Sequence, residues 1–454
     1  MSIDRRRLFA ALAGAGAAVA AGEAHSLPAR EFGSRAAIDA TSLGLRPNAA
    51  EDQTQAFQRA IEQAAAARAV LQLPAGVYRT GTLQLPLYAA ITGVPGATRI
   101  VMSGGPSMMQ ATGSDHIGIS GLALDGAGIP LPERRGLLHF AQGHSLRIAD
   151  CEIVNAGRNG ISLEGIEGEV TASTINAADI AIFSLDARAL RIAGNTVRGA
   201  GNGGILVWRS APGDDGTLVV DNRIEDVANK SGGSGQYGNA VNVFRADNVI
   251  VRGNRIRNAA FSAVRGNAAS NLQIVGNSCS SLGEVALYAE FGFQGALIAN
   301  NIVDGAAIGV SVTNFNKGGR LAVVQGNLIR NLVGRRPPGT DPNDSAGIGI
   351  GVEADTAVTG NVVENAANTG IAAGWGAYLR DVAITSNVVR GADYGITVSV
   401  APGAGAAVIA DNLISEVRSG AIVGMEWKKP VTGDLSKDGA SRYAQLSIVG
   451  NRVR

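Results

Sequence analysis

The chain has 454 residues, of which 62 are glycine, and only 4% are aromatic. Its formal net charge of +1 gives no support for nucleic acid or another polyanion as a partner. After residue 24 no apolar stretch approaches the roughly 20 residues of a membrane span, so the mature chain is expected to be soluble and without such a span. Aliphatic and small residues dominate, which favours many similar layers over one aromatic-rich core.

The N-terminus carries an export pattern. Arg5, Arg6 and Arg7 precede a weakly apolar, Ala/Gly-rich run over residues 8–21, and small residues follow it. This pattern predicts a twin-arginine signal peptide over residues 1–24 and a periplasmic or secreted location. The alternatives are a Sec signal that happens to carry three arginines, and a basic N-terminus without structure.

Residues 25–112 are expected to form an N-terminal cap and the first coils of a repeat. A helix is predicted over residues 52–69, with Asp52 as its N-cap and Gln55 as the capping-box partner. The apolar face of this helix is made by Phe57, Ala60, Ile61, Ala64 and Ala65. Since a solenoid must cover its open ends, this helix is expected to cover the N-terminal one.

One phrase recurs over residues 113–454: apolar-x-apolar-x-x-Asn-x-apolar, usually with glycine before the asparagine. Successive copies lie 22 to 39 residues apart, which is typical of a solenoid with insertions. The apolar residues alternate with period two, and a second short strand, Gly-Ile-x-Val, lies between copies, as at Gly204–Val207. The pattern predicts an all-β, right-handed parallel β-helix of about thirteen coils, with strands paired in parallel one coil apart. The phrase places these residues at its asparagine position: Leu122, Cys151, Ser173, Asn195, Asn222, Asn254, Asn277, Asn301, Asn327, Asn361, Asn387, Asn412 and Asn451.

The repeated asparagine has a structural explanation. Asparagine tolerates a left-handed backbone at a sharp turn, and an inward amide can bond the coils above and below it. Cys151 takes this position, and Cys279 takes the inward apolar position two residues after Asn277. The two cysteines lie five coils apart, roughly 24 Å along the axis, so both are expected to be buried thiols without a disulfide.

The N-terminal residues also resemble a known group of proteins. The resemblance to the N-terminal part of pectate-lyase-like β-helix proteins rests on Ala40–Leu45, the helix, Leu73–Tyr78, Gly81–Leu83 and Ile91–Gly93. Together with the arginine pair and the repeat phrase, it makes the chain similar to a family of twin-arginine-translocated repeat proteins of uncharacterised activity. The resemblance implies the fold over nearly the whole mature chain. It leaves the activity open, because lyases, hydrolases, epimerases, tailspikes and adhesins share this fold.

The catalytic motifs of these relatives are mostly absent. The chain has neither the Asn-Thr-Asp of polygalacturonases nor the Asp-Pro-His-Glu of mannuronan epimerases, and Gly143-His144-Ser145 is its nearest approach to Gly-His-Gly. The insertions do indicate which face is elaborated. Segments 228–239 and 334–346 enter the Gly-Ile-x-Val strand, and segments 210–216, 313–320 and 425–444 leave it. Loops on both sides of one strand layer predict a trough over that layer.

Aromatic residues mark this trough. Phe183, Trp208 and Phe244 are expected at the second outward position of three consecutive coils, with Tyr288 one coil further on. Stacked aromatics can stabilise neighbouring rungs, or they can form a platform for sugar rings, and the sequence leaves both open. The residues expected to bind substrate are Phe183, Trp208, Phe244, Asn242 and Lys317.

Arginines accompany the aromatics. Arg209, Arg245 and Arg265 are expected near the same strand end on successive coils, where they would repel one another unless an anion lay across them. An enzyme acting on an acidic polysaccharide would use an arginine to neutralise the uronate carboxylate, a nearby base, and a tyrosine to protonate the leaving oxygen. The candidate catalytic residues are Arg209, Arg245, Arg265, Tyr237, Tyr288 and Glu290.

Three functions follow from these patterns. The chain is an exported polysaccharide lyase or glycoside hydrolase on an acidic polymer, a non-catalytic glycan-binding protein, or a structural cell-envelope protein. Short acidic turns at Asp214-Asp215 and at Asp341 and Asp344 admit calcium, but such turns usually face solvent, so no metal or cofactor is predicted. The sequence does not indicate the oligomeric state.

Overall fold

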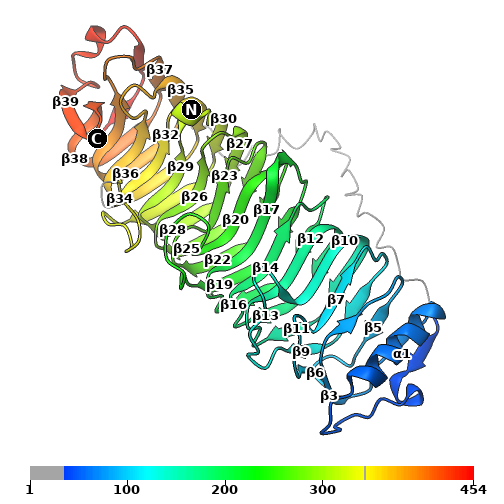
Figure 1. Ribbon diagram of the computed structural model, residues 1–454. Helices are drawn as coiled ribbons and strands as arrows, with labels where there is room; N and C mark the ends of the chain where they lie inside the picture. Colours follow the sequence, from blue (N-terminus) through cyan, green and yellow to red (C-terminus); the bar gives the residue numbers. More distant parts are fainter. Residues whose placement is uncertain (1–34, 342–343) are drawn as a thin grey trace, which may run out of the picture. The chain divides into compact units, whose positions relative to one another are not determined.

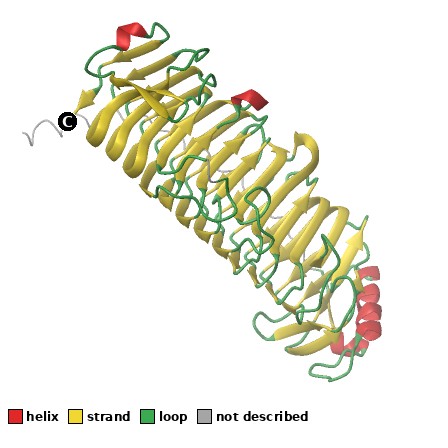
Figure 2. Cartoon of the chain, turned by 60° about the vertical axis from the view of Figure 1, so that its left-hand side comes forward, coloured by secondary structure: helices red, strands yellow, loops and turns green. Residues whose placement is uncertain are grey.

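The computed structural model describes residues 35–341 and 344–454, and nearly all of its strands pair in parallel with a strand one coil further along the chain. The predicted signal peptide lies outside the described residues. The fold is the expected all-β parallel β-helix, with about 14 turns against the thirteen predicted. Figure 1 shows the coils stacked in chain order from the blue end to the red end. Figure 2 shows how few helices accompany the strands.

The strands form three series. The first series carries the Gly-Ile-x-Val phrase, and its outward surface is called the GIxV face below. Its strands are β4 (Leu83–Gln84), β7 (Met109–Thr112), β10 (Gly136–Ala149), β12 (Asn159–Thr171), β14 (Ile180–Leu185), β17 (Gly203–Asp214), β20 (Asn239–Asp247), β23 (Val264–Asn267), β26 (Val285–Glu290), β29 (Ile308–Val312), β32 (Ile348–Val352), β34 (Val362–Ala373), β36 (Val388–Ser399) and β38 (Leu413–Glu426). Both β10 and β12 continue into the second series, whereas β34, β36 and β38 begin in the third.

The second series precedes the asparagine of each repeat. Besides β10 and β12 it contains β1 (Ala37–Asp39), β2 (Val70–Gln72), β5 (Ala90–Thr92), β8 (Gly118–Ser120), β15 (Arg191–Ala193), β18 (Leu218–Val220), β21 (Ile250–Arg252), β24 (Leu272–Val275), β27 (Gln294–Ala299), β30 (Arg320–Gln325), β33 (Ala354–Thr359), β35 (Arg380–Thr385), β37 (Ala407–Ala410) and β40 (Leu446–Val449).

The third series follows the asparagine. Besides the first halves of β34, β36 and β38 it contains β3 (Gly76–Thr80), β6 (Thr98–Met102), β9 (Ala123–Asp125), β11 (Glu152–Val154), β13 (Thr174–Asn176), β16 (Thr196–Arg198), β19 (Arg223–Val227), β22 (Arg255–Ala259), β25 (Ser278–Leu282), β28 (Ile302–Ala306), β31 (Leu328–Leu332) and β41 (Arg452–Val453). The remaining strand, β39 (Lys429–Asp434), forms an antiparallel hairpin with β38.

The cap helix is α1, which spans Thr54–Ala66 and covers the first coils at the blue end of Figure 1. It begins two residues later than predicted. The side chain of Asp52 nevertheless accepts a hydrogen bond from the backbone N–H of Thr54 at 2.8 Å. Gln55 does not act as a capping-box partner; instead Gln53 bonds the backbone of Arg46 at 2.8 and 2.9 Å. The five predicted apolar residues are the buried ones, so the predicted helix face is confirmed.

The asparagine ladder is confirmed and continuous. From Asn195 to Asn412, each ladder asparagine donates both its backbone N–H and its Nδ2 to the Oδ1 of the next one, at 2.8 to 3.1 Å, and Asn451 accepts the last pair. Each Nδ2 also donates to a backbone carbonyl of the preceding coil, as Asn277 does to Val251 at 3.0 Å. Ser173 and Cys151 extend the row: the backbone N–H of Ser173 donates to Asn195 Oδ1 at 3.0 Å, and that of Cys151 donates to Ser173 Oγ at 3.2 Å.

The predicted backbone conformation of these asparagines was wrong. The left-handed residue is the one before each ladder position, as at Gly276 with φ +67° and Asp411 with φ 57°. This explains why glycine so often precedes the asparagine, since glycine adopts that conformation without steric cost.

The two cysteines lie where the pattern placed them. Cys279 pairs in register with Ile256 and Val303 in the inward row of the third series. Both thiols are buried and free, and burial raises the pKa of Cys151 to about 11 and that of Cys279 to about 12. Of the described helices, none is long and apolar enough to cross a membrane.

Candidate functional site

The GIxV face has two outward columns of side chains. They flank the inward row that contains Leu163, Val207 and Val243, because side chains alternate across a strand. The first column runs through Ser162, Phe183, Leu206, Asn242, Arg265, Tyr288, Ser311, Gly351, Ala372, Thr397 and Val423. The second column runs through Glu164, Leu185, Trp208, Phe244, Asn267 and Glu290. The predicted aromatics therefore do not share one column.

Phe183, Trp208 and Phe244, called the aromatic row below, lie on neighbouring coils and pack against one another. Phe183 stands in the first column and Trp208 and Phe244 in the second, yet the rings meet edge to face, with centroids 5.5 and 5.8 Å apart. Phe183 is only 6% exposed, and the indole Nε1 of Trp208 donates to Asn242 Oδ1 at 3.1 Å. Tyr288 lies in the first column and does not continue this row. The geometry fits a packed satellite cluster on neighbouring rungs.

The predicted ladder of three arginines is wrong in its register. Arg209 and Arg245 directly follow Trp208 and Phe244 in β17 and β20 and are half-buried. Arg209 donates to the backbone carbonyl of Ala187 at 3.4 Å, and Arg245 donates to that of Ser210 at 3.2 Å. Arg245 also lies over the ring of Phe244, 4.7 Å from its centroid. Arg265 stands in the first outward column, away from the other two, and is 7% exposed.

Arg265 belongs to a buried ion cluster. Its Nε and Nη2 bond the two oxygens of Glu290 at 2.7 and 3.1 Å, and its Nη1 lies 3.4 Å from Glu284 Oε2 and donates to the backbone carbonyl of Ser234. Arg336 completes the cluster, with its Nη1 2.9 Å from Glu284 Oε1. Burial raises the pKa of the Glu284 carboxyl, and the two arginines oppose that rise. Both carboxylates are therefore saturated by arginines, as a buried charge requires.

This ion cluster ties two insertions to the GIxV face. Ser234 belongs to segment 228–239, and Arg336 to segment 334–346. The insertions also touch each other, since a Cβ on Gly339 would lie 3.8 Å from the backbone of Gly233. The described parts of the two loops thus bridge the middle of the face and cover Arg265.

The other predicted site residues lie apart. Tyr237 is half-buried in segment 228–239, and Lys317 is exposed at the end of a 3₁₀ turn, Phe315–Lys317. Tyr288 packs against Arg265, 5.0 Å from the guanidinium, and burial followed by the charge of Glu290 raises its pKa far above the usual range. The structure brings together Arg265, Tyr288 and Glu290, and it does not bring Tyr237 or Lys317 into a shared hydrogen bond with them in the described residues.

The acidic turns show local partners. Asp214 accepts from Asn248 at 2.7 Å, Asp215 is buried against Thr217, and Asp344 lies 3.3 Å from Arg336. Among the described residues no group of three or more His, Cys, Asp or Glu side chains is placed to hold a metal ion.

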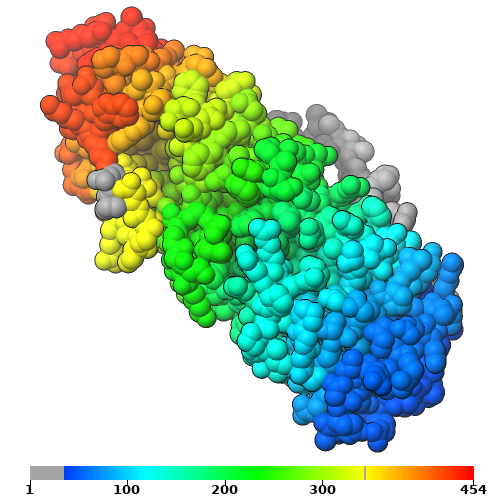
Figure 3. All heavy atoms as spheres, in the orientation of Figure 1, coloured from blue at the N-terminus to red at the C-terminus, as the bar shows by residue number. Residues whose placement is uncertain are grey.

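A pocket that the sequence analysis missed lies further along the same face. It has a volume of about 820 Å³ and is called the main pocket below. Its floor includes Ala372 and Thr397, two small members of the first outward column. Its walls are residues 334–338, 340 and 344–346 and the β38–β39 hairpin. Figure 3 shows the surface hollowed beside the yellow loop. The GIxV face is therefore hollowed over the C-terminal coils, and none of the predicted site residues lines this pocket.

Two tryptophans line this pocket. Trp375 and Trp427 meet edge to face with centroids 5.6 Å apart, and Trp427 is 50% exposed. Trp427 and Lys428 form the two-residue turn of the hairpin, and Trp427 has φ 57°, a conformation that asparagine or glycine would adopt at less cost. The ring rests on Gly376, where a Cβ would come within 2.4 Å of it. The position of two of the chain's three tryptophans in or beside insertions was the sequence signal that could have found this pocket.

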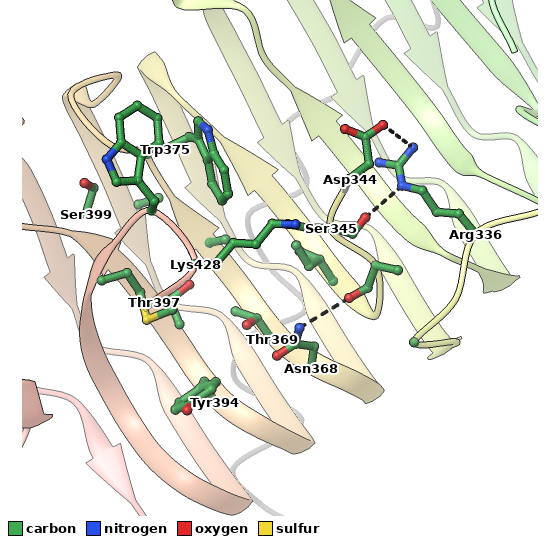
Figure 4. Close-up of a pocket in the computed structure, with 18 of the residues that line it drawn as sticks. Arg336, Asp344, Ser345, Asn368, Thr369, Trp375, Tyr394, Thr397, Ser399 and Lys428 are labelled. Atoms are coloured by element: carbon green, nitrogen blue, oxygen red, sulfur yellow. Dashed lines mark hydrogen bonds and ion pairs between the residues drawn. The ribbon is translucent and has the colours of Figure 1, made fainter. Parts of the chain in front are cut away.

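Polar groups surround the indoles. Figure 4 shows Lys428 between Trp375 and the pair formed by Arg336 and Asp344. Arg335 lines the same wall and is exposed. Hydroxyl and amide groups complete the lining, contributed by Asn368, Thr369, Tyr394, Thr397 and Ser399. Three cations against one carboxylate give this lining a net positive charge.

One buried carboxyl at the end of a GIxV strand has a raised pKa. Glu353 follows β32 and accepts a hydrogen bond from the backbone N–H of Phe315 at 2.7 Å, which fixes the turn at Phe315–Lys317. Burial raises the pKa of Glu353 to about 7, and the backbone N–H groups of Phe315 and Asn314 oppose that rise.

Comparisons with known proteins agree with the fold. The model of the family described as right handed beta helix region matches residues 212–387. No curated protein matches the chain. Among solved structures, the catalytic unit of a GH87 α-1,3-glucanase from Streptomyces thermodiastaticus is 13% identical with a TM-score of 0.50, covering 92% of this chain and 70% of that one.

Two further solved structures are similar. The N-terminal fragment of bacteriophage Phi29 gene product 12 is 16% identical with a TM-score of 0.50, covering 91% of this chain and 66% of that one. The A-module of the mannuronan C-5 epimerase AlgE6 from Azotobacter vinelandii is 14% identical with a TM-score of 0.43, covering 92% and 99%. At these identities the likeness establishes the fold alone.

Proposed function

We propose that this chain is an exported glycan-binding β-helix protein, and that its main pocket holds a segment of an acidic polysaccharide. The observation that carries the proposal is the pair of indoles beside Lys428 and Arg335 over a floor of small residues. An exposed indole offers a flat apolar face to a sugar ring, and the surrounding hydroxyl and amide groups match sugar hydroxyls. The net positive lining favours a polymer that carries carboxylates.

The strain at Trp427 supports the same proposal. A bulky side chain in a left-handed turn costs free energy, and such outliers persist where the side chain is needed in that place. Fold-level analogy adds a weaker argument, because the solved α-1,3-glucanase shows that this fold accommodates proteins acting on polysaccharides.

Binding without cleavage is the activity that the geometry favours. The candidate catalytic groups Arg265 and Glu290 are 7% and 2% exposed and are saturated by each other, so a polymer lying on the surface does not reach them. In the main pocket, Asp344 is the one carboxylate among the described lining residues, and it is paired with Arg336. Cleavage of an acidic polymer, by lyase or hydrolase chemistry, stays a prediction.

Calorimetric titration with oligogalacturonate, alginate fragments and neutral dextran tests the proposal. We expect an acidic oligomer to bind, Trp427→Ala to weaken it about tenfold, and Lys428→Ala to weaken acidic oligomers only, with added salt mimicking the second change. Trp208→Ala is the matched control, since it removes an indole on the same face outside the pocket. If no acidic polymer binds the wild type, the structural function replaces this one. Release of reducing ends or of unsaturated products would show that the protein also cleaves the polymer.

A further inference from the structure

A second pocket lies on the GIxV face near its N-terminal end. It has a volume of about 180 Å³ and is called the small pocket below. It lies over the strands β10, β12 and β14. From β12, eight strand-to-strand pairings lead to β34 of the main pocket, which is roughly 38 Å along the axis. The aromatic row and the buried ion cluster stand between the two pockets, so the small pocket is a separate feature.

The floor of the small pocket holds an unsatisfied imidazole. His139 occupies the first outward column between Gln110 and Ser162, and it is only 9% exposed. Its Nδ1 is buried and has no hydrogen-bond partner among the described residues. A buried polar atom without a partner is destabilising, so its retention needs an explanation, and a bound group at this position supplies one.

Ser162, also in the floor, forms two hydrogen bonds that position the residues around the pocket. The hydroxyl of Ser162 accepts from Asn159 Nδ2 at 3.0 Å and donates to the backbone carbonyl of Arg134 at 2.8 Å. This second bond fixes the loop that forms the rim. The ring of Phe183 and the side chain of Leu185 provide an apolar wall, and Phe183 is held by Trp208 behind it.

The rim is charged but balanced. Glu133 and Glu164 stand against Arg134 and Arg135, which leaves no net charge. Arg135 is oriented by Gln110, whose Oε1 lies 3.3 Å from its Nη1. Burial, and secondly the charge of Arg135, lower the pKa of His139 to about 4, so the imidazole is neutral near pH 7 and offers one donor and one acceptor. The lining therefore contains acceptors and donors in comparable number and no excess of cations, in contrast to the main pocket.

From this lining and from the unsatisfied imidazole, we propose that the small pocket binds one neutral sugar unit. Each sugar hydroxyl both donates and accepts, which matches paired carboxylates and guanidiniums around a neutral imidazole, and a C–H face packs on the apolar wall. The volume corresponds to about six water molecules at liquid density, which admits a single ring but not a disaccharide. The site does not rest on the function proposed for the main pocket.

Titration of the full-length protein with D-glucose, D-galactose and D-mannose, one at a time, tests this proposal, with D-galacturonate as the charged comparison. We expect at least one neutral sugar to bind with an affinity in the millimolar range, as is ordinary for a single small unit. His139→Phe should weaken that sugar at least tenfold, because the phenyl ring removes both nitrogen atoms and keeps the shape. His144→Phe is the matched control, since His144 lies on the same strand, is exposed, and lies outside the pocket.

Two results would overturn the proposal: no neutral sugar binding up to saturating concentrations, or unchanged binding in His139→Phe. Galacturonate is compared in Trp427→Ala, where the main pocket is weakened, and tighter binding of galacturonate than of every neutral sugar in that variant would also overturn it. Glu164→Ala, an exposed position on the rim, gives a second loss of affinity should His139→Phe fail to fold. Trp427→Ala must leave the neutral sugar unaffected. A failure of acidic polymers to bind the main pocket is therefore distinguishable from a failure of this site.

Discussion

Replacing Asn277 by leucine tests whether the ladder holds the coils together. The side chain takes part in four hydrogen bonds, two from its Nδ2 to Val251 O and Asn301 Oδ1 and two accepted by its Oδ1 from Asn254, all at 3.0 Å. Leucine is of similar volume but can make none of them. The backbone N–H of Asn254 and the carbonyl of Val251 would then be buried without these partners.

The magnitude follows from those two orphaned backbone groups. An unsatisfied buried group costs about 1–3 kcal/mol, so the free energy of unfolding should fall by about 4 kcal/mol, a large loss for a single substitution. Because leucine is of similar volume, it is expected to fit the space that asparagine leaves. Burial of its methyl groups then offsets part of this cost by about 1–2 kcal/mol. The net expectation is a loss of about 2–3 kcal/mol.

Urea denaturation and amide exchange measure this loss in complementary ways. Since each coil interacts with its neighbours, the variant should lose amide protection first in the coils that contain Asn254, Asn277 and Asn301, before the global unfolding transition. Asn316→Leu serves as the control because Asn316 is exposed and outside the ladder. Equal stability and equal exchange in the two variants would mean that the ladder bonds contribute nothing net and that inward packing alone holds the coils.

Three further predictions concern other residues. Trp208→Ala should lower the melting temperature by several degrees, because the indole is packed between two rings, and calorimetry of acidic oligomers should show affinity within about twofold of wild type. Glu353 has a folded-state pKa of about 7, above the 4.5 of an ordinary glutamate, so its contribution to stability is fully present below about pH 4.5 and is lost as pH rises to 7, about 3 kcal/mol in total. Urea melts of Glu353→Gln at pH 5 and pH 8 should therefore lack this component, and equal pH dependence in both proteins would refute it. Changing Arg5 and Arg6 to lysine should retain the protein in the cytoplasm, and fractionation that finds normal periplasmic yield would contradict the twin-arginine interpretation.

The repeat pattern was sufficient to predict the fold because its information is local. A ladder residue such as Asn277 needs only its own coil and the next to be placed, so spacing along the chain gives its row. The helix face and the inward place of Cys279 follow by the same argument. The left-handed position was misassigned by one residue because asparagine and glycine both favour it, and the phrase carries them side by side.

The site was less predictable because it depends on insertions. Counting outward positions placed Phe183 in the same column as Trp208, whereas the register puts Leu185 opposite Trp208. Arg265 is displaced by three residues, since it stands opposite Asn242 and not opposite Arg245. A slip of two residues leaves the inward and outward alternation intact, so nothing in the hydrophobic pattern exposes it. The contacts between segments 228–239 and 334–346 join parts of the chain that no periodicity relates.

The buried ion cluster decides how the face can be used. Arg265 alone would be an attractive cation for a uronate, but Glu284 and Glu290 neutralise it, and Arg336 brings segment 334–346 over it. Removing water from four charges is costly, and their mutual attraction offsets that cost without a clear net gain in stability. The cluster is better explained by what it positions: it holds one wall of the main pocket and closes the middle of the face. A ligand on this face therefore meets two separate hollows, one net positive and beside two indoles, the other balanced in charge and closed by a neutral imidazole, and each is expected to select a different kind of sugar.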